Sequence, residues 1–164
     1  MKEKSQIVIG IDPGYDRCGF GIIKGSGMDW VSVGYGVINT KADVDFSERL
    51  RELAEDFESI LKKYKPDHVI IEELFFAKST TTALKVAEAR GVLRMLAAKK
   101  GIEVIEVKPN EVKLALTGSG RAEKRQVQEM VKTTLKLKKV PTPDDAADAL
   151  AVAITGATKA SYAR

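Results

Sequence analysis

The residues best suited to chemistry are the acids that open the C-terminal part of the chain. Residues 144–151 read Asp-Asp-Ala-Ala-Asp-Ala-Leu-Ala, and the segment that they begin is otherwise almost wholly apolar. Thr142 and Pro143 precede it and predict a helix start, with Thr142 as the N-cap and Pro143 at the first helical position. We therefore expect a helix that brings several carboxylates into an apolar environment.

Asp148 is the carboxylate in this segment that helix capping does not explain. Asp144 and Asp145 would lie in the first turn, where the positive end of the helix dipole favours acids, so capping explains them about as well as function does. Asp148 lies one turn deeper on the same face. A helix that is apolar all round is buried, and a buried carboxylate needs a cationic partner, a proton or a metal ion.

Further carboxylates lie at the end of the first predicted strand and within the fourth. Asp12 closes the first strand, at the carboxyl end of the sheet where open α/β sheets hold their ligands, although an Asx-type turn explains it equally well. Glu72 and Glu73 interrupt the fourth strand, and one of the two can lie near Asp12 because successive strand residues face opposite ways. A site with only oxygen ligands selects Mg²⁺ or Mn²⁺ over zinc.

The spacing of apolar residues predicts an α/β fold in which helices flank a five-stranded mixed sheet. The first three strands form an antiparallel meander. The fourth strand follows a helical crossover, so we expect it to pair parallel with the first. The predicted strands are residues 7–12, 19–24, 30–38, 69–74 and 102–107; the predicted helices are an amphipathic one that Pro66 ends, then 80–99, 109–117, 122–135 and the acidic last helix.

The composition is that of an ordinary globular protein. We expect residues 1–164 to form one domain in which only the last few residues are flexible. The chain has 27 Lys and Arg against 23 Asp and Glu, which permits contact with nucleic acid. Cys18 and His68 are single residues of their kinds, which excludes an intramolecular disulfide and a cysteine zinc cluster and favours a structural role for His68. We find no membrane-spanning run and expect a cytoplasmic protein without membrane contact.

Five short segments resemble the bacterial RuvC family of Holliday junction resolvases, in the family order and over nearly the whole chain. The resemblance implies a ribonuclease H-like fold and a homodimer. It also selects Glu72 over Glu73 and leaves Asp144 outside the site, and some relatives carry His at position 145. The segments are residues 9–14, 71–78, 83–91, 122–127 and 145–150, and the implied catalytic and metal-binding residues are Asp12, Glu72, Asp145 and Asp148.

The resemblance implies an endonuclease that cuts four-way junction DNA during recombination and repair. Two Mg²⁺ ions, for which Mn²⁺ substitutes, would activate a water molecule and stabilise the leaving oxygen. Paired cuts on opposed strands would leave 5′-phosphate and 3′-hydroxyl ends, and a two-fold symmetric dimer supplies two equivalent sites. RuvA and RuvB are implied as partners by the family alone.

Three residues are predicted to bind DNA. Many basic residues flank the predicted cleft, and we expect at least half of them to lie on solvated faces, but Lys113 and Lys124 match family positions implicated in DNA binding or catalysis. Phe75 and Phe76 come shortly after Glu72, and by position alone at least one of them packs in the core. In the resemblance, Phe75 matches an aromatic residue that stacks on an unpaired base at the junction centre.

Three other functions fit parts of the sequence. The turn at Asp12 is similar to one in nucleotide-binding domains of the actin and sugar-kinase lineage, but those proteins need a second domain, for which this chain is too short. A non-catalytic junction-binding module would have no use for the carboxylates. The residues alone do not exclude a relative that processes RNA or linear DNA.

Overall fold

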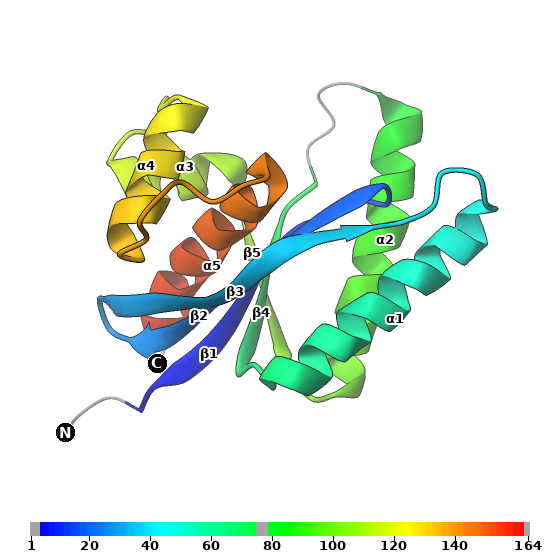
Figure 1. Cartoon of the computed structure of the whole chain (residues 1–164), viewed down its shortest axis with the longest axis horizontal. Coiled ribbons are helices and arrows are strands. Elements are labelled where there is room, and N and C mark those ends of the chain that lie inside the picture. The colour runs from blue at the N-terminus through cyan, green and yellow to red at the C-terminus, as the bar shows by residue number, and fades with distance from the viewer. Residues whose placement is uncertain (1–3, 75–78, 163–164) are drawn as a thin grey trace.

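The structure, a computed structural model, describes residues 4–74 and 79–162, which form a five-stranded sheet with helices on both faces (Figure 1). The strands are β1 (Gln6–Asp12), β2 (Arg17–Ser26), β3 (Asp29–Asn39), β4 (His68–Glu72) and β5 (Glu103–Val107), and the helices are α1 (Phe46–Tyr64), α2 (Thr80–Lys99), α3 (Pro109–Thr117), α4 (Lys124–Thr134) and α5 (Asp144–Tyr162). The sheet order is β3-β2-β1-β4-β5. Two hydrophobic clusters fill the molecule, one under α1 and α2 and the other under α3, α4 and α5.

The strand pairing agrees with the prediction from the sequence. β1 pairs antiparallel with β2, and β2 with β3, so the first three strands form a meander. β4 pairs parallel with β1, and β5 pairs parallel with β4. Ile71 lies opposite Ile11 in this register, so the residues that follow them, Glu72 and Asp12, end neighbouring strands at the same edge of the sheet. The five-stranded mixed sheet is therefore confirmed, and so is the predicted meeting of these two strand ends.

The start of α5 differs from the prediction by one residue. The helix begins at Asp144, and the carbonyl oxygen of Pro143 accepts hydrogen bonds from the backbone N–H groups of Ala146 at 3.0 Å and Ala147 at 3.4 Å. Pro143 therefore occupies the capping position that was predicted for Thr142, because its carbonyl closes the first turn. The other predicted helices start within two residues of the observed ones.

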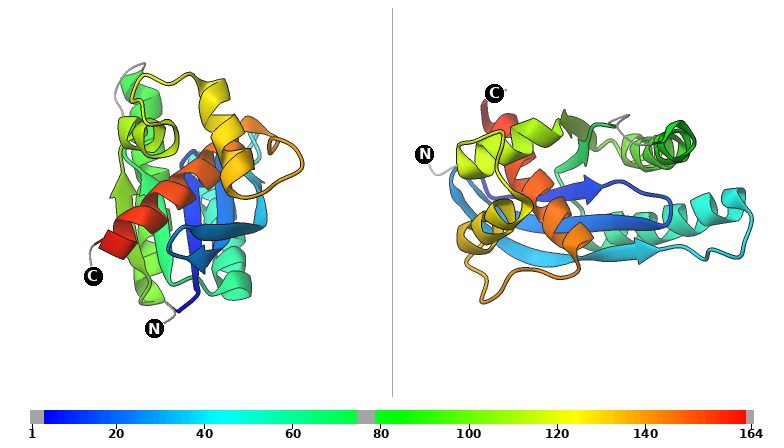
Figure 2. Two further views of the ribbon diagram at one scale, coloured as in Figure 1. Left: turned by 90° about the vertical axis from the view of Figure 1, so that its left-hand side faces the viewer. Right: turned by 90° about the horizontal axis from the view of Figure 1, so that it is seen from above.

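The α5 helix packs across β1 and β2, as Figure 2 shows from the side. Most of its residues are buried, as its apolar sequence predicts. Gly10 on β1 permits the close packing, because a Cβ atom at that position would lie 2.1 Å from the carbonyl oxygen of Ala149. The helix therefore lies almost directly on the strand backbone, with its acidic first turns above the sheet edge where β1 ends.

His68 is buried at the start of β4, at the opposite end of this strand from Glu72. Its Nε2 atom is 3.2 Å from Gln6 Nε2, and its Nδ1 atom is 3.2 Å from Glu103 Oε2. These contacts join the starts of three strands and agree with a structural role.

Among the described residues, no helix is both long enough and apolar enough to cross a membrane.

Candidate active site

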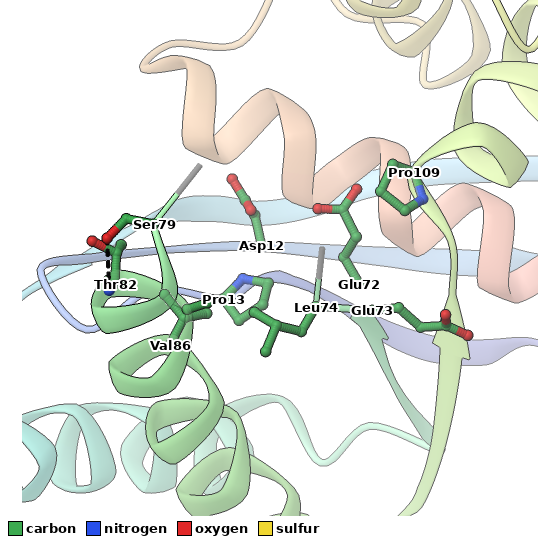
Figure 3. Close-up of a pocket in the computed structure, with 10 residues that line it drawn as sticks. Asp12, Pro13, Glu72, Glu73, Leu74, Ser79, Thr82, Val86 and Pro109 are labelled. Atoms are coloured by element: carbon green, nitrogen blue, oxygen red, sulfur yellow. Dashed lines mark hydrogen bonds between the residues drawn. The ribbon is translucent and has the colours of Figure 1, made fainter. Parts of the chain in front are cut away.

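Asp12 and Glu72 present their carboxylates at the edge of the sheet where β1 and β4 end. Both side chains point toward α5, whereas Glu73 points away from Asp12 (Figure 3). The two carboxylates line a cavity of about 510 Å³ whose other walls include Pro13, Thr82 and Pro109. Glu73, the first residue after β4, also lines this cavity, but Glu72 is the glutamate whose side chain points the same way as Asp12, toward α5.

Asp148 reaches the same edge from the second turn of α5. It lines a second cavity, of about 280 Å³, together with Glu72, Lys113 and Lys124. Because Glu72 lines both cavities, it lies between the space next to Asp12 and the space next to Asp148. Residues from β1, β4 and α5 thus converge, although they are far apart in the sequence.

Asp145 lies in the first turn of α5 and is joined to β2. Nε and Nη2 of Arg17 donate hydrogen bonds to Asp145 Oδ2 at 2.9 and 2.8 Å. Beneath this turn, Gly19 pairs with Asp12 across β2 and β1, and a Cβ atom at Gly19 would lie 2.1 Å from the Asp145 carbonyl oxygen. The missing side chain at Gly19 lets Asp145 approach the strand pair that carries Asp12.

The carboxylates at this edge act on one another electrostatically. Burial raises the pKa of Asp12 to about 7, with further increases from the charges of Glu72, Asp148 and Asp145. Burial and the charge of Asp148 likewise raise the pKa of Glu72 to about 7. Burial also raises the pKa of Asp148, against the opposing charge of Lys124. Four acids are thus held close enough to repel one another in a partly desolvated site.

This set of donors suits a hard metal ion. As the side chains stand, no three His, Cys, Asp or Glu residues within the described ranges come close enough together to hold a metal ion. The donors are nevertheless all carboxylate oxygens, which Mg²⁺ and Mn²⁺ prefer. A bound cation would offset both the burial of these carboxylates and their mutual repulsion, the two causes that raise the pKa values of Asp12 and Glu72. The structure brings the four predicted acids to one edge, and their use as metal ligands stays a prediction.

The predicted DNA-binding residues fall in two groups. Lys113 and Lys124 line the cavity next to Glu72 and Asp148, and the ammonium group of Lys124 lies 3.2 Å from Asp148 Oδ2. Phe75 lies outside the described residues, and its predicted stacking role stays a prediction.

Two arginines at the site were not found from the sequence. Arg17 meets Asp145 from 128 positions away, and no local pattern indicates such a pair. Arg90 on α2 is mostly buried; its Nε donates to the Glu72 carbonyl oxygen at 3.1 Å, and its Nη2 donates to Glu106 Oε2 at 2.8 Å. It therefore ties the end of β4 to β5. The sequence signal that could have indicated this role is the position of Arg90 among small residues, on a helix that covers the sheet.

Comparisons with known sequences identify one family. A sequence profile described as "Crossover junction endodeoxyribonuclease RuvC" matches residues 8–156. The crossover junction endodeoxyribonuclease RuvC of Heliobacterium modesticaldum is 49% identical over 148 residues, which cover 90% of this chain and 91% of the relative. The protein of the same name from Thermotoga maritima is 49% identical over 146 residues, which cover 89% and 87% of the two chains.

The structure is also similar to solved structures. T. thermophilus RuvC in complex with Holliday junction substrate matches it with a TM-score of 0.92 and 34% identity, over 96% of each chain. The yeast mitochondrial Holliday junction resolvase Ydc2 matches with a TM-score of 0.69 and 14% identity, over 92% of this chain and 77% of that one. The second likeness shows a shared fold only.

Proposed function

Because this chain belongs to the RuvC family of crossover junction endodeoxyribonucleases, we propose that its active site consists of Asp12, Glu72, Asp145 and Asp148. The protein is a metal-dependent nuclease that resolves Holliday junctions in recombination and repair, and its fold is the ribonuclease H-like fold of these enzymes. Residues 1–164 form one nuclease domain in this proposal, and the protein acts on DNA in the cytoplasm. Membership of this family argues against the two alternatives from other classes, a nucleotide-binding domain and a non-catalytic junction-binding module.

The observation that best supports this active site is that acids from three separate segments of the chain lie at one edge of the sheet. Asp12 and Glu72 end parallel strands at one edge, and α5 brings Asp145 and Asp148 to the same edge. When bound, two Mg²⁺ ions, or Mn²⁺ in their place, supply the activation of water and the stabilisation of the leaving oxygen. The four acids bind and orient these ions, with Glu72 facing both cavities. The products are a 5′-phosphate and a 3′-hydroxyl.

Lys113 and Lys124 bind the phosphates of the strand that is cut. Both side chains line the cavity next to Glu72 and Asp148, on the side of the site that α3 and α4 form, and Lys124 Nζ lies 3.2 Å from Asp148 Oδ2. Phosphate contacts carry affinity and little sequence information, so junction binding should weaken steeply with salt. Phe75 stacks on an unpaired base at the junction centre in this proposal, which for this residue rests on the family resemblance.

The proposed site is tested by separating binding from cleavage. Glu72→Gln keeps the shape of the side chain and removes its charge, so the variant should bind a four-way junction with unchanged affinity and cut it at least about a hundredfold more slowly. Fluorescence anisotropy without divalent ions measures binding, and product formation under single-turnover conditions measures cleavage. Normal cutting by Glu72→Gln would remove this residue from the active site.

A homodimer would supply the paired sites that a two-fold symmetric junction requires. The surface that supports this proposal is on α2, where Leu84 and Met95 are 56% and 49% exposed. Gly91 lies between them along the helix, and a Cβ atom there would meet nothing within 4 Å. Exposed apolar residues around a glycine suit the close packing of a second copy. RuvA and RuvB are the partners that the family suggests.

A further inference from the structure

Asp144 opens α5 and holds two side chains of α4. Its Oδ1 atom accepts a hydrogen bond from Gln128 Nε2 at 3.2 Å, and its Oδ2 atom lies 3.2 Å from Lys124 Nζ. The same Nζ atom lies 3.2 Å from Asp148 Oδ2. Lys124 and Gln128 are one turn apart on α4, and Asp144 and Asp148 are one turn apart on α5. Four polar side chains therefore form a chain of contacts between the two helices, in the order Gln128, Asp144, Lys124, Asp148.

The carboxylate of Asp148 has two partners to satisfy in the proposed mechanism. A metal ion and the ammonium group of Lys124 carry the same sign of charge, so they compete for Asp148. Asp144 offers Lys124 a second carboxylate that is not one of the four proposed metal ligands. Both oxygens of Asp144 contact side chains of α4, and helix capping does not explain these contacts.

We propose that Asp144 is a positioning residue that keeps Lys124 beside the cleavage site when Asp148 binds metal. This inference rests on the proposed function of Asp148 and Lys124. A lysine side chain loses much rotamer freedom when it is fixed, so an exposed ammonium group needs an anchor to stay in one place. Lys124 is 55% exposed, and Gln128 fixes the anchor from the same helix.

The test is a double-mutant cycle with single-turnover cleavage of a four-way junction. Asp144 is exposed, and Asn has nearly the same size and shape as Asp, so Asp144→Asn should fold normally. With enzyme in saturating excess over the junction, so that any weaker phosphate contact does not limit the rate, we expect it to cut about threefold to tenfold more slowly than the wild type. Asp144→Glu should recover most of the rate. In the Lys124→Gln background, Asp144→Asn should cause no further loss.

A matched control separates the anchor from general charge effects. Glu129 is exposed on α4 and pairs with Lys132, so Glu129→Gln removes one acid from the same helix pair without touching Lys124. It should cut at the wild-type rate. An equal loss in Glu129→Gln, or an equal loss from Asp144→Asn with and without Lys124, would show that only the local charge matters and would overturn the inference.

Metal affinity gives a second readout that does not depend on cleavage. Without Asp144, Lys124 pairs with Asp148 alone and competes more strongly, so Mg²⁺ affinity measured by calorimetry should fall in Asp144→Asn. The fall should be absent in the Lys124→Gln background, and a fall of the same size there would contradict the inference. Wild-type protein that cuts no junction would overturn the proposed function itself, whereas normal cutting by Asp144→Asn would overturn the anchor alone.

Discussion

Gly19 lies directly beneath Asp145, and a Cβ atom at Gly19 would come within 2.1 Å of the Asp145 carbonyl oxygen. The backbone cannot move aside as a flexible side chain would, so Gly19→Ala must push the first turn of α5 off the sheet. We expect a loss of about 1 to 3 kcal/mol in unfolding free energy and a loss of cleavage of more than about tenfold. Thermal melts and junction cleavage measure the two effects.

Gly120→Ala is the control for this prediction. A Cβ atom at Gly120 would have Asn110 O as its nearest neighbour, at 3.9 Å, so the substitution should change neither the melting temperature nor the cleavage rate. Gly19→Ala with wild-type cleavage would show that the position of Asp145 does not depend on this contact.

Arg17 neutralises Asp145 through two hydrogen bonds to the same carboxylate oxygen. Arg17→Gln leaves this acid without its partner, so the site becomes more negative and attracts divalent cations more strongly. We expect the Mg²⁺ affinity of the DNA-free protein to rise about twofold to fivefold, as removal of one partly exposed ion pair allows. Calorimetry measures it, with Arg51→Gln on α1 as the control. Unchanged or weaker Mg²⁺ affinity would mean that Arg17 does not compete for Asp145.

The raised pKa values predict how stability depends on pH without metal. Burial and then the neighbouring acids raise the pKa of Asp12 from 3.8 to about 7, and that of Glu72 from 4.5 to about 7. Between these limits the folded state binds more protons than the unfolded state, so the unfolding free energy falls as pH rises from about 4 to about 7. Asp12→Asn lacks one titrating group and should melt at a higher temperature than the wild type above pH 7.

Thermal melts in EDTA from pH 5 to 8.5 check this prediction. For a chain of this size, each kcal/mol changes the melting temperature by roughly 2 to 4 °C. The advantage of Asp12→Asn should shrink as the pH falls. Asp56→Asn, on the exposed face of α1, should follow the wild type throughout. A lower melting temperature for Asp12→Asn at pH 8 would contradict the proposed repulsion.

Leu84, Gly91 and Met95 form an exposed stripe on α2, and a charge on this stripe should disrupt the proposed dimer. Met95→Arg places a cation on this stripe and should shift the protein from dimer to monomer in sedimentation equilibrium, because two cations would then meet across the two-fold axis. Met28→Arg changes a residue that is 90% exposed in the turn between β2 and β3, and should leave the dimer intact. A wild-type monomer at micromolar concentration would count against the dimer, and so would a dimer of Met95→Arg.

The sequence predicts most of the fold and the grouping of the acids, for local physical reasons. Apolar spacing places the strands, and a parallel pairing of β1 with β4 follows from the crossover, which brings Asp12 to Glu72. The contacts of Arg17 and Arg90 depend on tertiary packing between segments that carry no local signal of each other. Asp144 shows the limit most clearly: its position at a helix start indicates a cap, but its carboxylate contacts α4 instead.

The most direct test of the proposed active site is Mg²⁺-dependent cleavage of a synthetic four-way junction beside a linear duplex of the same sequence, by the wild type and by Asp148→Asn. The wild type should make symmetric nicks on opposed strands of the junction, leave the duplex intact and lose all cutting in EDTA. Asp148→Asn should bind the junction and leave it uncut. Cleavage by Asp148→Asn at the wild-type rate would contradict the assignment of the four carboxylates.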